Sequence, residues 1–277
     1  MEVEQGRSEV RHVKRRVGYV KKGILKKKKR MVMMKTPNCG PNCEYLSTLQ
    51  QLFVSCLRVF KGPNTIPLPS HVNILSQILD RMKAEDFGLS SDIHFFNPTD
   101  VVKATPPRLC IFFIPTNGVI PLHNHPGMTV FSKLLLGDMH IKSYDWVDQE
   151  EAAGDVEDLG LAKLKANSVF RAPCNTSVLY PRSGGNIHEF RAITPCAVLD
   201  VIGPPYSKED GRDCSYYKDH PYSSNSTDKE NYCKVVEEGE NGNYAWLEEI
   251  EMGEECEMDV IEYMGPQIMN TKLRNYL

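Results

Sequence analysis

Two histidines in alternate positions, His123 and His125, lie in a stretch rich in proline and strand-forming residues. On an extended chain, side chains two residues apart point to the same face, so both imidazoles would be presented together. Two imidazoles on one strand supply half of a transition-metal site. Pro121 before the pair and Pro126-Gly127 after it make the segment rigid and bounded by turns. The sequence therefore predicts a metal centre, and two surface histidines in a loop are the alternative.

A third histidine, His188, follows Gly184-Gly185 and leads into another strand-like run. Glycine permits a tight turn and close backbone approach. Three neutral imidazoles on two strands suit a facial site with open positions for a substrate and oxygen. Among the other histidines, His140 is the best alternative because it also lies on a strand-like run, but we expect it to take part in sheet packing. The rest are expected in a basic arm, beside helix ends or in a polar loop: His12, His71, His94 and His220.

Two amphipathic helices are predicted before the strands. Apolar residues recur with helical spacing in 49–60, where Gly62 and the proline after it should stop the helix, and again in 74–82. We expect Ser70 to cap the second helix, which should end near Gly88. These apolar stripes are explained most simply by packing against a sheet.

From residue 109 onward, short apolar runs alternate with turns rich in glycine, proline and asparagine. Many short strands with such punctuation indicate an all-β barrel or jelly roll. Strands are expected at residues 109–114, 128–136, 139–146, 161–170, 177–180, 187–193, 196–202, 244–251 and 256–263. Residues 207–240 are polar and charged, so we expect them to cross the surface and to separate the last strands from the others.

The arrangement of these motifs resembles a known superfamily. His-x-His followed by Gly137, and then Gly-x-x-His at 185–188, match the two sequence motifs of the cupin barrel. Cupins usually have a glutamate ligand four or five residues after the second histidine, where this chain has Thr129 and Val130. A cupin with three histidines and no such glutamate is similar to the thiol dioxygenases.

Longer strings narrow the resemblance. Residues 121–130, 132–137, 143–146 and 203–206 are similar to the plant cysteine oxidases, which are relatives of the animal cysteamine dioxygenase. The likeness covers about residues 45–264. It implies an all-β cupin fold (a double-stranded β-helix, or jelly-roll barrel) with the N-terminal helices packed outside.

The resemblance also implies a cofactor and a reaction. It implies Fe(II) held by His123, His125 and His188, with O₂ as the oxidant. Oxidation of a thiol to a sulfinic acid takes both oxygen atoms and four electrons from sulfur, so no external reductant is needed. Neutral ligands leave the iron its full double positive charge, which favours an anionic thiolate. Ligand type alone does not select iron, because imidazole also suits zinc, copper and nickel.

The substrate implied by the resemblance is the N-terminal cysteine of a protein, such as a group VII ethylene response transcription factor. The sulfinic acid would permit arginylation and degradation, so that turnover reports oxygen supply. Two alternatives stay open: a dioxygenase of free cysteine or cysteamine, and a catalytically silent cupin that binds metal as a nuclear interaction module. A metal-dependent isomerase or germin-like oxidase is disfavoured by the missing glutamate and by the lack of a secretion signal.

Two further residues are candidate catalytic groups. Asp200 lies in an apolar strand, where an unpaired carboxylate is costly. It either makes a structural hydrogen bond or salt bridge, or binds the substrate amine or orients a ligand histidine. Tyr206 follows two prolines on an expected loop over the barrel mouth, where it either bonds the substrate or oxygen or lines the rim. Family members are thought to use an aspartate and a tyrosine at these positions. Cys214 and Tyr216 match a pair that can form a thioether in the animal relative, and we expect no crosslink here.

Composition agrees with one domain carrying extensions, since 277 residues with 41% apolar content can form a substantial core. No run of 18 apolar residues exists, so no membrane span is predicted. The 9 cysteines are odd in number and scattered, which suits a reducing compartment. The pair Cys39 and Cys43 is spaced one residue too far apart for a thioredoxin-type motif, so we expect a turn before a helix there.

Charge is divided unevenly. Residues 1–35 contain 13 basic and 3 acidic side chains, whereas the remainder contains 20 and 33. The basic cluster at 26–30 is typical of a nuclear import signal, and a solvated tail is the alternative. We therefore predict a disordered basic arm at 1–43, a cupin domain with leading helices at 44–265, and a tail at 266–277. Direct nucleic-acid binding is not expected, and the family likeness implies a monomer in the nucleus and cytoplasm.

Overall fold

The computed structural model describes most of the predicted cupin domain. The described residues are 47–62, 65–90, 100–103, 108–147, 159–222, 243–251, 253, 258–260, 263, 265–266 and 268. The predicted arm of residues 1–43, with Cys39 and Cys43, lies outside them, as does nearly all of the tail expected from residue 266. None of the described helices has the length and hydropathy needed to cross a membrane.

Two helices precede the strands, α1 (Thr48–Val59) and α2 (Pro69–Arg81). The side chain of Ser47 caps α1 by accepting a hydrogen bond from the backbone amide three residues later, at 3.2 Å. The predicted cap of α2 is wrong, because Ser70 lies inside the first turn. Pro69 starts this helix instead, since its fixed φ angle and missing N–H suit the first helical position. A 3₁₀ helix, η1 (Ala84–Phe87), then leads to Gly88.

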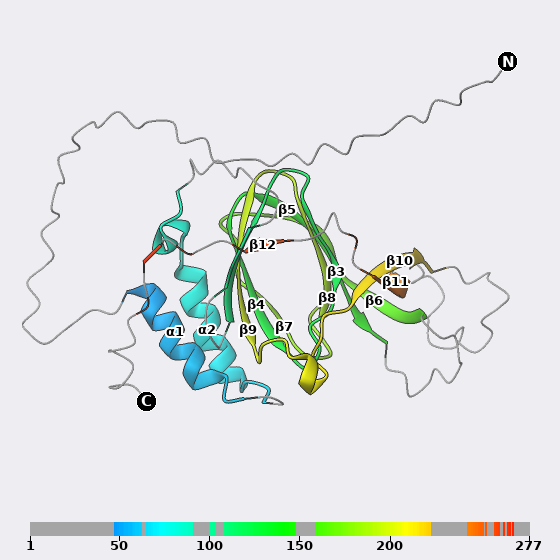
Figure 1. Cartoon of the computed structure of the whole chain (residues 1–277), viewed down its shortest axis with the longest axis horizontal. Helices are drawn as coiled ribbons and strands as arrows, with labels where there is room; N and C mark the ends of the chain where they lie inside the picture. The colour runs from blue at the N-terminus through cyan, green and yellow to red at the C-terminus, as the bar shows by residue number, and fades with distance from the viewer. Residues whose placement is uncertain are drawn as a thin grey trace, which may run out of the picture. The chain divides into compact units, whose positions relative to one another are not determined.

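The strands of the described residues form two sheets, each of six strands, and the two sheets face each other (Figure 1). The first sheet has the order β12 (Asp259–Val260), β1 (Asp100–Lys103), β2 (Arg108–Ile114), β9 (Cys196–Gly203), β4 (Thr129–Leu136) and β7 (Ser177–Leu179). The second closes on itself in the order β10 (Tyr216–Pro221), β11 (Tyr244–Ile250), β6 (Leu159–Arg171), β5 (Asp138–Trp146), β8 (Ile187–Ala192) and β3 (Val119–His123). All described strand pairs are antiparallel except β1 with β12.

Strand β9 shows how the layers stack, because every one of its residues is buried. Leu199 and Val201 pack with the helices, whose core residues include Leu52. Val198 faces the other way and packs with Phe190 of the second sheet. The helices therefore cover the outer face of the first sheet, and the two sheets enclose the central core (Figure 1). The predicted all-β cupin jelly roll with helices packed outside is confirmed.

The second sheet closes because β10 pairs with both β11 and β3. The contact with β3 places Tyr216 opposite His123. The closed part encloses an apolar cluster of its own, separate from the core between the sheets. Its buried members are Leu122, Tyr144, Ala162, Ile187, Tyr217, Ala245 and Leu247.

The prediction that residues 207–240 only cross the surface is wrong in part, because strand β10 lies within that segment. Only Tyr217 of this strand is fully buried, because a single face of β10 meets the apolar cluster. Its sequence is therefore mostly polar and gave no strand signal. His220, expected in a polar loop, lies on β10, where its Nε2 atom is 2.7 Å from a carboxylate oxygen of Glu248 on β11.

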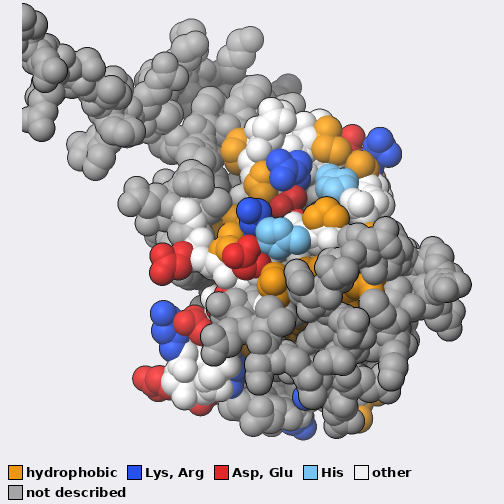
Figure 2. All heavy atoms as spheres, turned by 90° about the vertical axis from the view of Figure 1, so that its right-hand side faces the viewer, with side chains coloured by type: hydrophobic (Ala, Val, Ile, Leu, Met, Phe, Trp, Pro, Cys, Tyr) orange, Lys and Arg blue, Asp and Glu red, His pale blue; other side chains and the backbone are white. Residues whose placement is uncertain are grey.

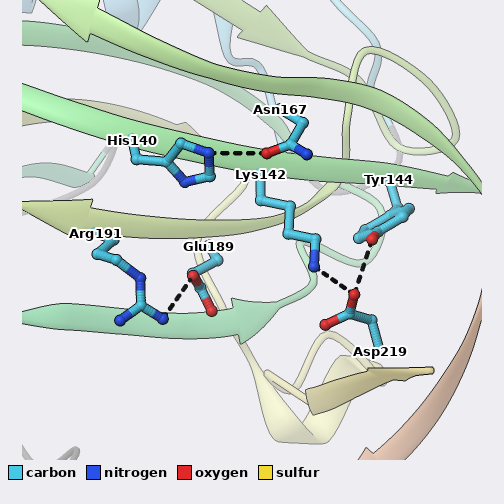
Figure 3. Close-up of polar contacts among 7 residues, drawn as sticks. All are labelled: His140, Lys142, Tyr144, Asn167, Glu189, Arg191 and Asp219. Carbon is cyan, nitrogen blue, oxygen red and sulfur yellow. Dashed lines mark hydrogen bonds and ion pairs between the residues drawn. The ribbon is translucent and has the colours of Figure 1, made fainter. Parts of the chain in front are cut away.

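Polar side chains join the strands of the second sheet (Figure 3). The Tyr144 hydroxyl donates to Asp219 at 3.0 Å, and Lys142 forms an ion pair with the same carboxylate, which ties β5 to β10. His140 bonds Asn167 on β6 at 2.8 Å, as expected for a residue that takes part in sheet packing. On the side of the molecule shown in Figure 2, described side chains of opposite charge lie next to one another.

Gly137, at the turn between β4 and β5, provides a test of the cupin turn. Its φ angle is +89°, and a Cβ atom there would lie 2.3 Å from the carbonyl oxygen of Pro195. We predict that Gly137→Ala lowers the free energy of unfolding by about 3 kcal/mol or more, through both backbone strain and this clash. Gly211→Ala is the control, because Gly211 has φ +69° but no atom within 4 Å of the added Cβ, so about 1 kcal/mol is expected. Urea unfolding midpoints measure both, and equal losses would contradict the prediction.

Candidate metal centre

The three predicted histidines come from two neighbouring strands and a turn. His123 is the last residue of β3 and lies opposite His188 of β8. His125 follows in the turn after β3, and the pairing of β3 with β8 shifts register between Ile120 and His123. The presentation therefore differs from the extended strand expected from His-x-His spacing, because the strand ends at the first of the two histidines. The turn brings the second ring to the same place.

The three imidazoles converge. The centroid of the His123 ring lies 4.8 Å from those of His125 and His188, and the latter two centroids are 4.7 Å apart. Nitrogen atoms that could serve as ligands all lie within 4.8 Å of one another, and this is the one such cluster among the described residues. The arrangement is compatible with a single metal ion bound by three nitrogen atoms.

Hydrogen bonds fix which nitrogen of each ring is available. A carbonyl oxygen can only accept, so Nδ1 of His123 donates to Pro121 at 2.8 Å and Nδ1 of His125 donates to Asn186 at 3.1 Å. Nε2 of each ring is then the unprotonated nitrogen. Nε2 of His188 is buried and has no hydrogen-bond partner in the described part of the chain. A buried nitrogen without a partner is costly in a metal-free site and is what a ligand atom requires.

Electrostatics keep the rings neutral. Burial lowers the pKa of His123, and it lowers the pKa of His188 further with the help of the two neighbouring histidines. Burial and the nearby His123 lower the pKa of His125 to about 3. All three imidazoles are therefore uncharged at neutral pH, and the uncharged imidazole is the form that binds metal.

No carboxylate belongs to this cluster in the part of the chain that the structure describes. Val130, at one of the positions where cupins usually have glutamate, lies in an apolar cluster with Met128 and Ile202. The other position, Thr129, is buried as well. The candidate donor set among the described residues therefore consists of three neutral imidazoles.

Asp200 lies in the space between the two sheets. It shares a face of β9 with Val198 and Ile202, which pack in the central core, and it lies opposite Ser132 of β4. Burial raises the pKa of Asp200 to about 7, against a smaller opposite effect of Ser132. Its Oδ1 atom is buried without a hydrogen-bond partner, and no salt bridge to it occurs among the described residues. The described residues therefore provide no structural salt bridge for Asp200.

Tyr206 lies beside the histidines. The centroid of its ring is 5.8 Å from that of His125, and its hydroxyl donates to the backbone oxygen of Asn124 at 2.9 Å. Burial, with the nearby Cys214 thiol, raises the pKa of Tyr206 well above its usual value, so the phenol stays protonated. Cys214 is a free thiol that hydrogen-bonds with Tyr206 and Tyr216.

Asn124, between the two histidines of the motif, was not predicted to matter. Its side chain donates to the Tyr217 hydroxyl at 3.0 Å and accepts from the backbone amide of Ser215 at 2.9 Å. Its own amide donates to the Ser215 carbonyl at 3.1 Å. Asn124 thus attaches the chain leading into β10 to the metal-ligand turn. These partners are about 90 residues away in sequence, so no local signal identifies them.

Comparison with known proteins identifies the family of the chain. The PCO_ADO family model matches residues 78–268. Over 241 residues the chain is 45% identical to Plant cysteine oxidase 1 of Arabidopsis thaliana, covering 80% of this chain and 81% of the relative. Over 236 residues it is 47% identical to Plant cysteine oxidase 2 of the same organism, covering 79% and 83%. A Klebsiella pneumoniae structure with a double-stranded β-helix domain is 12% identical, covers 49% of this chain and 88% of its own, and has a TM-score of 0.30.

The raised pKa of Asp200 has a consequence for stability. In the unfolded chain an aspartate ionises near pH 4, whereas in the folded chain Asp200 keeps its proton up to about pH 7. Stability of the metal-free protein should therefore fall as pH rises from 4 to 7. We predict that Asp200→Asn removes this fall, so that its stability relative to the parent increases by a few kcal/mol at most, on the order of 1.4 kcal/mol per pH unit.

Urea unfolding with a chelator present, at several pH values, measures this difference. Glu251→Gln is the control, because Glu251 is exposed. A stability difference between the Asp200→Asn variant and the parent that stayed constant from pH 4 to 8 would contradict the assignment.

Proposed function

We propose a specific reaction for this chain, which belongs to the PCO_ADO family and is a cysteine (thiol) dioxygenase. In this reaction the protein uses Fe(II) and O₂ to oxidise the N-terminal cysteine of protein substrates to a sulfinic acid. The observation that carries the proposal is the convergence of three neutral imidazoles, those of His125 and His188 buried and that of His123 half-buried, in a chain of this family. One thiol and one O₂ give one sulfinic acid, and sulfur supplies all four electrons. No further reductant is required.

His123, His125 and His188 are the proposed ligands, through nitrogen atoms that the fold leaves available. The buried Nε2 of His188 without a partner supports this assignment most directly. Bound there, Fe(II) would supply a positively charged, redox-active centre that favours the thiolate form of the substrate and activates O₂. The neutral donor set supports iron with undiminished charge but does not by itself select iron over other metals.

Asp200 is proposed to recognise the substrate's amino group. An N-terminal cysteine carries an ammonium close to its thiol, and Asp200, which has a buried oxygen without a partner among the described residues, is near enough to Tyr206 beside His125 for its charge to act on that phenol. An ammonium placed beside this carboxyl would favour its ionised form. The Tyr206 ring lies next to His125, and its hydroxyl donates a hydrogen bond to the backbone oxygen of Asn124. Because the pKa of Tyr206 is raised, the phenol keeps its proton.

We further propose that the substrates are transcription factors that begin with cysteine, of the group VII ethylene response type, and that their oxidation feeds an N-degron pathway which reports oxygen supply. The names of the two Arabidopsis relatives support a cysteine substrate. A monomer acting in the nucleus and cytoplasm fits this role, with the basic cluster at residues 26–30 as the import signal.

His188→Ala tests the metal assignment. We predict that the variant loses at least tenfold in Fe(II) affinity, because a three-ligand site loses one donor. It should also fail to add about 32 mass units, the two oxygen atoms of a sulfinic acid, to a Cys-initiated peptide in air. Intact-mass measurement of the peptide and iron analysis of the protein provide the two readouts. His140→Ala is the control, because His140 bonds Asn167 away from the cluster. Undiminished iron and activity in the His188→Ala variant would refute the assignment.

Recognition of the amino group is tested with substrates that differ in charge. We predict that acetylating the N-terminus of the peptide raises KM at least tenfold in the parent, because an uncharged amide cannot form the ion pair that an ammonium would form with the Asp200 carboxylate. The same acetylation should change KM much less in the Asp200→Asn variant. Free cysteine and cysteamine, assayed beside the peptide, identify a small-thiol enzyme if they react with higher kcat/KM. An equal response of parent and variant to acetylation would rule out Asp200 as the amine-binding group.

A further inference from the structure

We infer that Asp145 is a positioning residue for the metal centre, which holds His125 in place through the backbone of residues 184–186 and the side chain of Asn186. The inference rests on the proposed role of His125 as a ligand. Asp145 lies near the end of β5 and is buried. It does not touch the imidazoles, so its effect must pass through the segment between them.

The carboxylate of Asp145 accepts hydrogen bonds from three consecutive backbone amides. Gly184 donates to Oδ2 at 3.0 Å, while Gly185 and Asn186 donate to Oδ1 at 2.8 and 3.0 Å. The ammonium of Lys165 lies 3.7 Å from Oδ2 and is partly exposed. Successive amides around one anion form a compact nest, in which each charge-assisted bond is stronger than a neutral one.

The shape of this loop depends on an acceptor at its centre. Gly184 and Gly185 have φ angles of +85° and +83°, so neither belongs to a regular ladder. A Cβ atom on Gly185 would lie 2.5 Å from the Ser143 hydroxyl, which shows how closely the loop packs on β5. Amides buried in such a loop need a partner inside the protein. Asp145 is that partner.

Asn186 then holds His125 by three bonds. Its side-chain oxygen accepts from the His125 amide at 3.0 Å, and its side-chain nitrogen donates to the His125 carbonyl at 3.0 Å. Its backbone carbonyl accepts from Nδ1 of the ring at 3.1 Å. His125 lies outside the strands, so Asn186 takes the place of a ladder partner for it and also sets the ring's tautomer.

The same loop leads directly into His188, two residues after Asn186. Two of the three ligands therefore depend on one segment, His125 through hydrogen bonds and His188 through the chain. His123 differs, because its ring donates to Pro121 within its own strand. Loss of the acceptor at Asp145 should thus disturb two ligands and spare the third.

Co(II) is the probe of choice, because its visible spectrum reports ligand number and geometry without any turnover. We expect Asp145→Asn to weaken Co(II) binding by 10- to 100-fold, the range seen for residues that orient metal ligands. We also expect its spectrum at saturating Co(II) to differ from that of the parent. Asp138→Asn is the matched control, since Asp138 lies on the same strand and, among the described residues, its carboxylate forms an ion pair with the exposed Arg171, at 3.4 Å. This control should bind as the parent does.

A purely structural role is separated by a variant that is destabilised elsewhere. Leu52→Ala removes buried contacts under the helices, so it should lower the melting temperature while leaving Co(II) affinity and spectrum unchanged. If Asp145→Asn folds poorly, Asn186→Asp serves as a second variant. The aspartate keeps a side-chain oxygen that accepts from the His125 amide, but it lacks the side-chain nitrogen that donates to the His125 carbonyl.

Parental affinity and spectrum in the Asp145→Asn or the Asn186→Asp variant would overturn the inference, as would an equal weakening by Leu52→Ala. The proposed metal site is judged separately by His188→Ala. If His188→Ala bound Co(II) as the parent does, the histidine assignment itself would be wrong, whatever the Asp145 variants did.

Discussion

Three uncharged imidazoles side by side, two of them buried and that of His123 half-buried, are the constraint on which the rest of the site depends. Each ring has two nitrogen atoms, and a buried nitrogen without a hydrogen-bond partner lowers the stability of the fold. The fold supplies carbonyl acceptors for Nδ1 of His123 and His125, and Nε2 of His188 has no hydrogen-bond partner among the residues that the structure describes. The irregular backbone around them follows from this need. A register shift in β3 and two glycines with positive φ before His188 bring carbonyls and rings together where regular strands could not.

Closure of the second sheet makes this burial possible. Strand β10 pairs with β3 at His123, and Asn124 fastens the chain before β10 to the ligand turn. The ring of Tyr206 lies beside that of His125. The surroundings of the imidazoles are thus assembled from segments that are far apart in sequence. Their low polarity lowers the pKa of the histidines and raises that of Asp200 through one and the same effect, desolvation.

The sequence predicted those parts whose signals are local. Strands such as β2 and β9 are largely apolar and bounded by turn residues, and the three histidines that converge in the structure were singled out from their spacing. Strand β10 was missed because only Tyr217 on it is fully buried, and the start of α2 was misplaced because Pro69 outweighed the capping preference of Ser70. The partners of the ligands could not be predicted, since His125 and Asn186 are 61 residues apart and meet only in the folded chain.

A carboxylate that is near the site but outside the ligand set has a different effect from one that binds the metal. A ligand glutamate would lower the charge of a metal centre permanently, whereas here one of the positions at which cupins usually have that glutamate is Val130, in an apolar cluster. Asp200 has a pKa of about 7, so its charge responds to what lies beside it. A cationic amine would draw it into the ionised form, while a neutral group would leave it protonated. On the proposed function, discrimination by substrate charge would fall to a residue that can change its own charge, and a metal held by three neutral imidazoles would keep its full attraction for a thiolate.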